Sequence, residues 1–326
     1  MYKVTLMFTE RCNIACRHCC VSEHDFFDQG RDMPLPEVFH YIDQMVQLAA
    51  QHREQYVISF SGGEAFLRYP DLLEAVRYAK KNGAHHLSCM TNGFWGKDPA
   101  LAQKWANELN TAGLNVIGFS IDDFHQQFVP LDSVRNAFQA CRNLGMEITI
   151  KSVVTRKTRR LPAILGELGD LLLNYNAVVQ EIACIPEGRA SHAIGSDEWL
   201  CQKGIPEEPC MAGIMLVIFP DGSTFPCCGT GWNRWLILGD AQVEPIAELF
   251  QKAESKSLCV LLREEGPKYF VPFFQQAGHH LPSEGYANSC HLCRTILNHH
   301  QAENIVPQVI LDWKTRRVRS VLGNFL

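Results

Sequence analysis

Short apolar segments rich in β-branched residues alternate with longer segments of helical periodicity between residue 3 and about residue 186. The short segments predict six strands, at residues 3–8, 56–60, 85–90, 115–120, 147–154 and 178–185. The longer segments repeat apolar residues at three- and four-residue spacing and predict helices at about residues 35–52, 70–82, 98–112, 132–145 and 160–173. Strands and helices that alternate in this way form a parallel sheet with crossover helices.

The polar motifs in this part of the chain directly follow predicted strands. They occupy residues 9–20, 61–64, 91–93, 121–125 and 186–189. Six strand-helix units are too few for a closed barrel of eight, but they suit an open barrel whose active site lies at the carboxyl ends of the strands. We therefore predict an α/β fold, a partial (β/α)6 TIM barrel, over residues 1–190.

A second module is expected over residues 191–326, because the alternation stops after Arg189. Residues 214–219 and 223–226 predict a β-hairpin around the turn Pro220-Asp221-Gly222. One helix is expected near residues 243–264, and the remainder is expected to be rich in loops.

Composition and charge restrict the class of protein. The chain of 326 residues is 46% hydrophobic and 20% charged, which suits a folded protein with a substantial core. A formal net charge of -5 argues against broad binding to nucleic acid or to anionic membranes. The N-terminus lacks the pattern of a secretory signal, and the longest apolar run, residues 214–219, is too short to span a bilayer. We predict a cytoplasmic protein that binds neither nucleic acid nor membrane.

Fourteen cysteines in a reducing compartment indicate metal binding or redox chemistry wherever they cluster, because disulfides are rare there. Cys12, Cys16 and Cys19 form a C-x3-C-x2-C motif directly after the first predicted strand. Three thiolates leave one iron of a 4Fe-4S cluster open to bind another molecule. A structural zinc site with His18 or Cys20 as its fourth ligand is the alternative, although such close spacing is unusual for one.

This cysteine loop resembles that of the radical S-adenosylmethionine (SAM) superfamily, whose C-x3-C-x-aromatic-C motif matches Cys12, Cys16, His18 and Cys19. The resemblance implies that SAM chelates the open iron and that His18 flanks its adenine. It also implies a one-electron reductant of the flavodoxin or ferredoxin type. Reduction of the cluster would cleave SAM to methionine and a 5'-deoxyadenosyl radical, which abstracts hydrogen from the substrate.

Further polar residues lie where similar enzymes contact SAM. Gly62, Gly63 and Glu64 resemble the GGE motif, which binds the methionine amino group; on its own, this tripeptide would indicate only a turn. Four residues lie at or near strand ends where the ribose and carboxylate of SAM are contacted: Asn92, Ser120, Asp122 and Lys151. For each of the four, a capping or turn role is an equal alternative.

A second cysteine set lies in the C-terminal module. Eleven residues separate Cys210 from Gly222, and four residues separate Gly222 from Cys227. Further along the chain, Cys290 and Cys293 form a C-x2-C motif. The predicted hairpin brings Cys210 and Cys227 together. The pattern resembles the twitch module, a shortened SPASM domain, and implies one auxiliary 4Fe-4S cluster, so the chain would hold two clusters in all. A structural zinc ion bound by four cysteines is the alternative.

Cys228 is expected to have a role of its own. Successive side chains of an extended strand point to opposite faces, so Cys227 and Cys228 should not bind the same cluster. If Cys227 is the ligand, Cys228 could point toward the barrel mouth and donate a hydrogen atom to a substrate radical. A buried inert thiol, or Cys228 itself as the ligand, is the alternative.

The paired cysteines and the chain length resemble those of twitch-bearing epimerases of ribosomally synthesised peptides (RiPPs). This resemblance implies a precursor peptide as the partner, abstraction of a Cα hydrogen, and return of hydrogen from Cys228 to give a D-residue. Asp123 and His125 are candidate substrate contacts, with helix N-capping as the competing explanation. Oxidative peptide cross-linking, a small-molecule dehydrogenase and a zinc-stabilised binding protein without turnover are the alternative functions.

Overall fold

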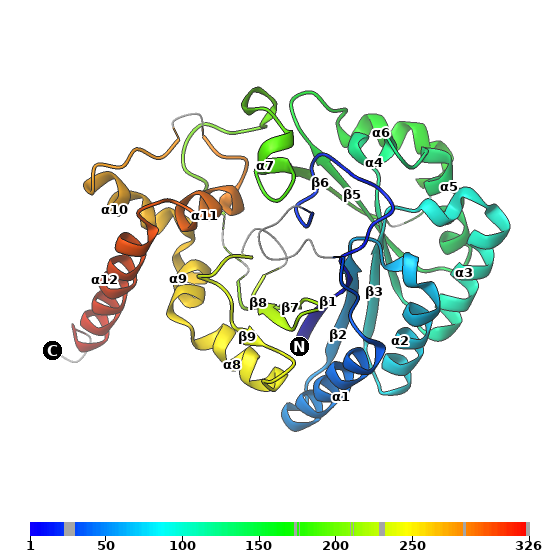
Figure 1. The fold of residues 1–326 in the computed structure, drawn as a ribbon, viewed down its shortest axis with the longest axis horizontal. Coiled ribbons are helices and arrows are strands. Elements are labelled where there is room, and N and C mark those ends of the chain that lie inside the picture. The colour runs from blue at the N-terminus through cyan, green and yellow to red at the C-terminus, as the bar shows by residue number, and fades with distance from the viewer. Residues whose placement is uncertain are drawn as a thin grey trace.

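The computed structural model describes residues 1–22, 30–172, 175, 177–208, 210, 212–227, 232–282 and 285–323. Within these residues, one nine-stranded sheet has the order β6-β5-β4-β3-β2-β1-β7-β8-β9 (Figure 1). Its strands are β1 (Tyr2–Thr9), β2 (Tyr56–Gly62), β3 (His86–Thr91), β4 (Val116–Ser120), β5 (Glu147–Val154), β6 (Val178–Ala183), β7 (Leu216–Ile218), β8 (Ser223–Phe225) and β9 (Gly239–Asp240). The main helices of the barrel half are α1 (Leu35–His52), α2 (Tyr69–Lys81), α3 (Pro99–Ala112), α5 (Leu131–Asn143) and α6 (Leu161–Leu168), with the short α4 (Asp123–Gln126) and α7 (Ala190–Ala193).

The first six strands pair in parallel, and this confirms the predicted partial barrel. Each predicted strand lies within two residues of its observed bounds, and α1 has the predicted bounds. The helix predicted at residues 160–173 ends earlier, at Leu168. Gly169 follows it with φ +61°, a conformation that ends an α-helix and that glycine adopts without strain.

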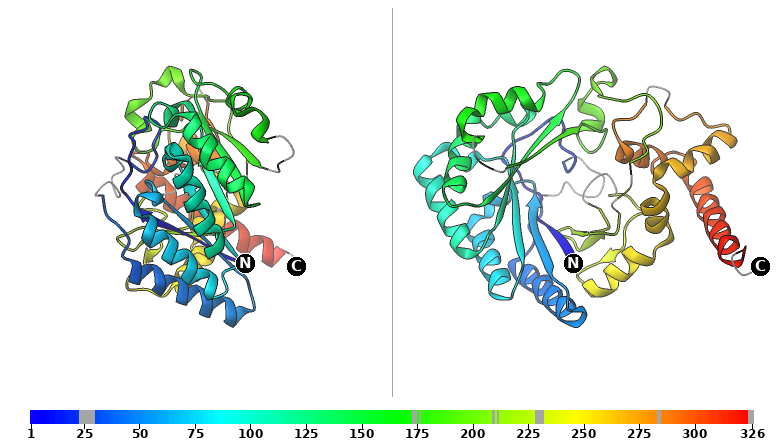
Figure 2. Two further views of the ribbon diagram at one scale, coloured as in Figure 1. Left: turned by 90° about the vertical axis from the view of Figure 1, so that its right-hand side faces the viewer. Right: turned by 180° about the vertical axis from the view of Figure 1, so that it is seen from behind.

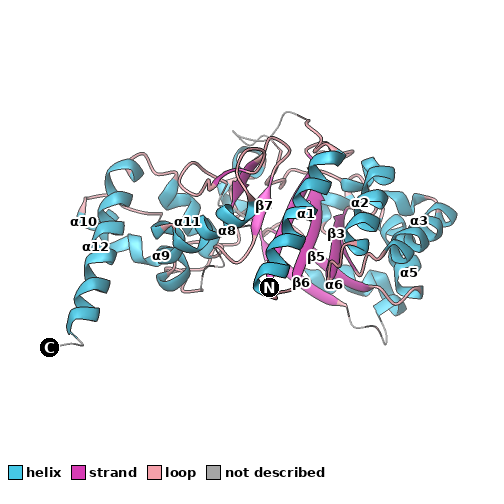
Figure 3. Cartoon of the chain, turned by 90° about the horizontal axis from the view of Figure 1, so that it is seen from below, coloured by secondary structure: helices cyan, strands magenta, loops and turns pink. Residues whose placement is uncertain are grey.

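The two faces of the barrel sheet differ in burial. In β5, Ile148, Ile150 and Val154 are buried on the helix-covered face, while the side chains between them are partly exposed on the opposite face. The same period of two recurs in β3. The helices lie on the outer side of a curved sheet, whose other face is turned inward (Figures 2 and 3). That inner face carries polar groups, including Ser59 and Ser88, whose hydroxyl oxygens lie 2.6 Å apart.

The hairpin of the C-terminal half extends the barrel sheet. β7 pairs in parallel with β1, with Val4 opposite Leu216 and Leu6 opposite Ile218, and β8 and β9 continue the sheet in antiparallel fashion. One buried apolar cluster runs from the barrel into the C-terminal helices. Main-chain hydrogen bonds therefore join the two halves, and the proposed division at residue 190 stays a prediction.

The prediction of a single helix near residues 243–264 is wrong. The structure has two helices, α8 (Ile246–Ser255) and α9 (Ser257–Glu265), separated by Lys256 in an extended conformation. No Pro or Gly marks this break; instead the Lys256 ammonium donates a hydrogen bond to the Ile237 carbonyl at 2.8 Å, a contact that only the tertiary structure supplies. The segment expected to be rich in loops holds three further helices, α10 (Val271–Gln276), α11 (Ser289–Leu297) and α12 (Ala302–Gly323).

Within the part of the chain that the structure describes, no helix combines the length and the hydrophobicity that crossing a bilayer requires.

Replacing Ile218 by Ala tests whether the two halves form one folding unit. Ile218 is fully buried in β7, so the variant should lower the free energy of unfolding by about 2–5 kcal/mol. Because β7 pairs with β1, the loss should appear in one transition shared by both halves, followed by far-UV circular dichroism and tryptophan fluorescence in urea. Val243→Ala, at a side chain 78% exposed, is the control and should change stability by about 0.5 kcal/mol or less. A barrel transition that stays unchanged in Ile218→Ala would contradict the expectation.

Candidate active site

The first cysteine set lies on the loop that follows β1. Cys12 is exposed, Cys16 is buried and Cys19 is half-buried. The Cys19 amide donates to the Cys16 carbonyl at 3.2 Å, which forms a turn between the two thiols. Arg189, beyond the end of β6, donates from its guanidinium to the Cys16 carbonyl at 3.2 Å and from its amide to the Ser22 carbonyl at 2.8 Å. The loop is thus fastened across the open end of the barrel.

A second set of contacts holds the same loop from β6. The Arg17 guanidinium donates to the Ala193 carbonyl at 2.7 Å. Gly188 has φ +52°, and a Cβ atom there would lie 2.7 Å from the carbonyl oxygens of Cys19 and Cys20. Glycine is therefore required where the two backbones meet.

Gly62 and Gly63 bring the end of β2 against the start of the cysteine loop. A Cβ atom on Gly62 would lie 2.2 Å from the Thr9 carbonyl oxygen, and one on Gly63 would lie 2.1 Å from that of Arg11. The Gly63 amide donates to the Thr9 carbonyl at 2.7 Å, and the Glu64 amide donates to the Arg11 carbonyl at 2.9 Å. The two glycines thus set the position of the backbone next to Cys12, while their contact with SAM stays a prediction.

The Glu64 carboxylate is directed into the protein. It accepts hydrogen bonds from the Thr91 hydroxyl at 2.9 Å, the Asn92 amide at 2.7 Å and the Phe66 amide at 3.1 Å. Burial raises the pKa of Glu64 to about 7, against the opposing effect of these donors. Asn92 in turn donates from its side chain to the side-chain oxygen of Asn13 at 2.9 Å. Glu64 and Asn92 therefore connect the ends of β2 and β3 to the cysteine loop.

Asp122 is a buried carboxylate at the end of β4. It caps α4 by accepting a hydrogen bond from the His125 amide at 3.1 Å, which is the capping role given as an alternative from the sequence. It also lies 2.8 Å from His125 Nδ1 and 3.8 Å from His18 Nε2. Burial opposes its ionisation, but the charge and hydrogen bond of His125, with the contribution of His18, lower the pKa of Asp122 to about 2. The carboxylate is therefore ionised at neutral pH.

His18 fits the position expected for a residue beside a polar ligand. Its ring stacks on Phe124, with centroids 4.6 Å apart, and burial lowers its pKa to about 4. The Nδ1 atom of His18 is buried and has no hydrogen-bond partner among the described residues. A buried polar atom without a partner is costly, so a ligand that supplies one would be bound favourably here.

The remaining predicted residues of the barrel divide into two groups. Ser120 and Lys151 are register partners on β4 and β5, and both are half-buried on the inner face. The Asp123 carboxylate, by contrast, accepts from the Arg159 amide at 2.7 Å and the Arg159 guanidinium at 2.6 Å. Asp123 already has a structural role, so its contact with a substrate, like that of His125, stays a prediction.

Two cysteines of the second set lie on one helix. Cys290 and Cys293 belong to α11, which Asn288 caps by accepting from the His291 amide at 3.0 Å. Burial raises the pKa of Cys293 well above its usual value, and ionised thiols at Cys210, Cys227, Cys290 and Cys259 would raise it further. Cys259 is not one of the predicted ligands, so a metal group shared by Cys210, Cys227, Cys290 and Cys293 stays a prediction. Cys228 lies outside the described residues.

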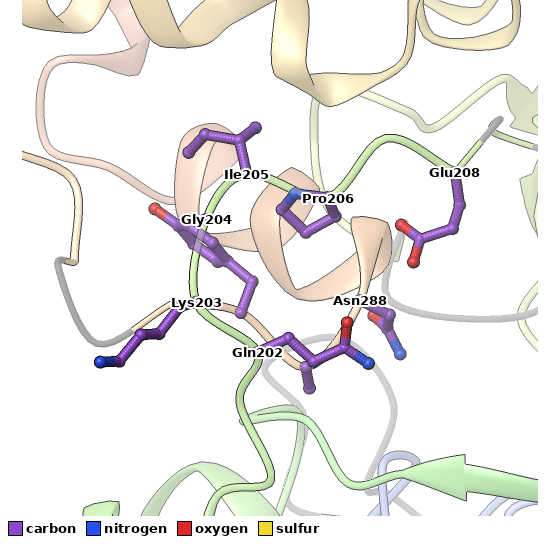
Figure 4. A pocket seen from close by; sticks show the side chains of 9 residues that line it. Gln202, Lys203, Gly204, Ile205, Pro206, Glu208 and Asn288 are labelled. Carbon is purple, nitrogen blue, oxygen red and sulfur yellow. The ribbon is translucent and has the colours of Figure 1, made fainter.

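Cys210 reaches α11 through a segment that runs beside the start of that helix. Gln202 and Tyr286 exchange backbone hydrogen bonds at 2.9 and 3.1 Å, and the Ser289 hydroxyl donates to the Glu208 carboxylate at 2.8 Å. Figure 4 shows the segment from Gln202 to Glu208 around a pocket of about 40 Å³. A hollow of this size holds little more than one water, so we regard it as part of the support for Cys210.

The spacing of the thiols bears on which metal group they suit. Two thiolates on one zinc ion lie at most about 4.6 Å apart, because each Zn–S bond is about 2.3 Å. In the described part of the chain, two triads of candidate ligand atoms lie within 4.8 Å of one another: Cys16, His18 and His125, and His279, His299 and His300. Neither cysteine set forms such a group among the described residues, so the choice between a zinc ion and a cluster stays a prediction. An ion on the first triad would compete with the cysteine loop for Cys16.

Sequence reasoning missed the ion pair between Arg294 and Glu187. Arg294 directly follows Cys293 on α11, and Glu187 is fully buried in the turn after β6. The pair links the second cysteine set to the segment that holds the cysteine loop. The only sequence signal was that Glu187 belongs to a polar strand-end motif, which does not identify a partner 107 residues away.

Comparison with known proteins agrees with this site. Residues 6–157 match the Radical SAM superfamily. Over 303 residues the chain is 26% identical to YydG of Bacillus subtilis (strain 168), a protein assigned by name to peptide biosynthesis, and the match covers 90% of this chain and 92% of YydG.

Solved structures share the fold. The structure of anSMEcpe with bound AdoMet and the Cp18Cys peptide has a TM-score of 0.55 at 16% identity, covering 100% of this chain and 99% of that one. SuiB of Streptococcus suis bound to the precursor peptide SuiA has a TM-score of 0.53 at 15% identity, covering 88% of this chain and 75% of SuiB. The family match spans the cysteine loop and the Gly62-Gly63-Glu64 turn. Residues 6–157 of this chain therefore form a domain of the radical SAM superfamily.

Proposed function

We propose that the protein is a radical SAM enzyme that converts one L-residue of a ribosomally made precursor peptide into a D-residue. The observation that carries the peptide assignment is the similarity to YydG over nine-tenths of both chains. It extends well beyond the radical SAM domain into the C-terminal half, so the two proteins share more than a common SAM-cleaving core. The name of YydG places that protein in peptide biosynthesis.

In this proposal Cys12, Cys16 and Cys19 bind the first 4Fe-4S cluster. When bound, the reduced cluster and SAM supply a 5'-deoxyadenosyl radical that can abstract hydrogen from a peptide Cα. The chain's own contribution is to position and shield these groups. The Gly62-Gly63 backbone fixes the position of the cysteine loop by close contact. The Nδ1 atom of His18, which has no hydrogen-bond partner among the described residues, offers a polar contact to the nucleoside.

The inner face of the sheet supplies the remaining contacts. Ser120 and Lys151 offer a hydroxyl and an ammonium group next to each other for the ribose or the carboxylate of SAM. Ionised Asp122 keeps His125 and His18 in fixed orientations rather than meeting the ligand directly. Polar side chains elsewhere on this face, such as Ser59 and Ser88, leave it suited to a hydrogen-bonding substrate such as a peptide backbone.

The second cysteine set, Cys210, Cys227, Cys290 and Cys293, holds the auxiliary 4Fe-4S cluster in the proposal. What supports it is that Cys210, Cys227 and Cys290 lie near enough to Cys293 for their charges to raise its pKa. The buried pair of Glu187 and Arg294 would keep this cluster at a fixed position relative to the cysteine loop.

Cys228 is the proposed hydrogen donor. Cys227 lies near enough to Cys293 to affect its pKa, and the proposal gives its neighbour Cys228 a separate role. The Cys228 S–H bond breaks as a new Cα–H bond forms on the face opposite the abstraction. The sulfur radical that remains takes up one electron and one proton, supplied by a flavodoxin- or ferredoxin-type reductant and by water, and this regenerates the thiol.

Gly63→Ala should disable SAM cleavage without unfolding the protein. A methyl group there cannot fit beside the Arg11 carbonyl, so the backbone next to Cys12 must shift. Displacing a reacting group by about 1 Å can reduce a rate by about 100-fold. We expect a loss of that order in 5'-deoxyadenosine formation by the reduced enzyme, measured by liquid chromatography. Gly166→Ala, where an added Cβ meets nothing within 4 Å, is the matched control and should cleave SAM at the wild-type rate. Equal rates in the two variants would contradict the role given to Gly63.

Iron analysis tests the two clusters separately. Anaerobically reconstituted protein should bind about eight irons, because each cluster contains about four. Replacing Cys12, Cys16 and Cys19 by Ala should leave about four irons and abolish SAM cleavage. Replacing Cys290 and Cys293 by Ala should also leave about four, but the electron paramagnetic resonance signal that responds to SAM should persist. A wild-type content of about four irons, with zinc in the second set, would remove the auxiliary cluster from the proposal.

Isotope incorporation tests the reaction itself. Reduced enzyme, SAM and a candidate precursor peptide in deuterated water should give a product that gains one deuterium, because the Cys228 thiol exchanges with solvent. In Cys228→Ala the deuterated product should disappear while SAM cleavage continues. Cys201→Ala, at a cysteine outside both sets, should behave as the wild type. Loss of two hydrogens from the peptide in both wild type and Cys228→Ala would instead assign oxidative cross-linking.

A further inference from the structure

Three histidine rings gather where the C-terminal helices meet. His279 follows the end of α10, and His299 and His300 lie in the turn between α11 and α12, three helices that adjoin in Figure 1. One ring nitrogen from each of the three lies within 4.8 Å of the other two. Their ring centroids are 5.2 Å apart for His279 and His299, 5.4 Å for His279 and His300, and 4.2 Å for His299 and His300. None of the three belongs to either cysteine set.

Main-chain hydrogen bonds hold the turns that present these rings. The His279 amide donates to the Phe274 carbonyl at 2.9 Å, after Gly278 with φ +77° has ended α10. The His299 carbonyl accepts from the Ala302 amide at 2.8 Å, which starts α12. The His299 ring also packs edge-on against Phe274, with centroids 5.0 Å apart. The positions of the rings are thus set by ordered turns rather than by a flexible tail.

The ring of His299 is poorly suited to carrying positive charge. Burial lowers the pKa of His299, and the neighbouring rings of His300 and His279 lower it further. Neutral imidazole is the form that binds metal ions, and a bound cation would occupy the space between three lone pairs. The burial of the set is graded, since His279 and His299 are half-buried and His300 is exposed.

We propose that His279, His299 and His300 bind one zinc ion. Imidazole nitrogen suits zinc among the divalent cations, and three histidines with an open fourth position for water make a familiar tetrahedral arrangement. Zn–N bonds of about 2.0–2.1 Å place the nitrogens about 3.3 Å apart, so the rings must close by about 1.5 Å at most. The Gln301 amide donates to His299 Nδ1 at 3.1 Å, and the ion displaces this bond. One such bond is a small loss against the affinity of three imidazoles for zinc.

The ion would tie the end of α10 to the turn between α11 and α12. α11 also carries Cys290 and Cys293, so this tie would fix the C-terminal end of the helix that presents two thiols of the second set. The inference stands without the proposed peptide epimerisation, because it depends only on the geometry of the three rings.

The test uses protein whose cysteine sets have first been loaded with iron and sulfide under anaerobic conditions. One equivalent of zinc sulfate is added, unbound metal is removed by gel filtration, and zinc and iron are counted by mass spectrometry. We expect one zinc per chain with no loss of iron. Zinc-edge X-ray absorption should show nitrogen or oxygen neighbours and no sulfur. His279→Asn and His299→Asn should each weaken zinc binding at least tenfold in competition with a chelator. His280→Asn, at an exposed neighbour outside the cluster, is the matched control.

Several outcomes would overturn the proposal. One is wild-type protein that retains no zinc after gel filtration. Another is a zinc site with sulfur neighbours, which would place the ion on the cysteines. A third is equal loss of zinc in His280→Asn and His299→Asn. Circular dichroism and iron content of each variant show whether it has folded, and His300→Asn, at the exposed ring, provides a variant whose folding the substitution should not disturb.

Discussion

The close contact between two stretches of backbone, at the carboxyl ends of β1 and β2, is the constraint on which the rest of the site depends. Gly62 and Gly63 approach the Thr9 and Arg11 carbonyls so closely that no side chain fits between them. This contact fixes where the chain leaves the sheet and hence where Cys12 begins the cysteine loop. Gly188 plays the same part on the opposite side, against Cys19 and Cys20. Glycine at both contacts lets main-chain atoms, rather than mobile side chains, determine the position of the three thiols.

The short segment after β6 contacts both the loop of the first cysteine set and the helix α11 of the second. Arg189 binds the carbonyls of the first loop, and Glu187, two residues earlier, forms a buried ion pair with Arg294 on α11. Because removing the partner of a buried carboxylate is strongly destabilising, this pair restricts how far α11 can shift from the barrel. The segment after β6 therefore acts as a common support for both sets. The Arg189 guanidinium contacts the loop of the first set, and the Glu187 carboxylate contacts the helix that carries two cysteines of the second set.

Much of this arrangement was predictable from local pattern. The six parallel strands follow from the alternation of apolar segments. The inner-face positions of Ser120 and Lys151 follow from their strands. These features depend on residues close together in the sequence, whose spacing a regular strand or helix converts directly into a position.

The remainder depends on contacts between distant segments, which no local pattern contains. The break at Lys256 is accompanied by a hydrogen bond to Ile237, and the pairing of Glu187 with Arg294 joins residues far apart in the chain. The hydrogen bonds that Arg159 donates to Asp123 likewise could be identified only in the tertiary structure. The triad of His279, His299 and His300 has no local signature in the sequence, because two turns at the ends of different helices bring the rings together.

The pairing of β7 with β1 has a consequence for how the chain acquires its structure. β1 ends at Thr9, but the strand that covers its second edge starts at Leu216, so this edge remains unpaired until more than two hundred residues have left the ribosome. Such a high contact order slows folding and leaves an apolar strand open to intermolecular pairing in the meantime. The nascent chain is therefore most exposed to aggregation, and most dependent on chaperones, at the strand from which the cysteine loop emerges.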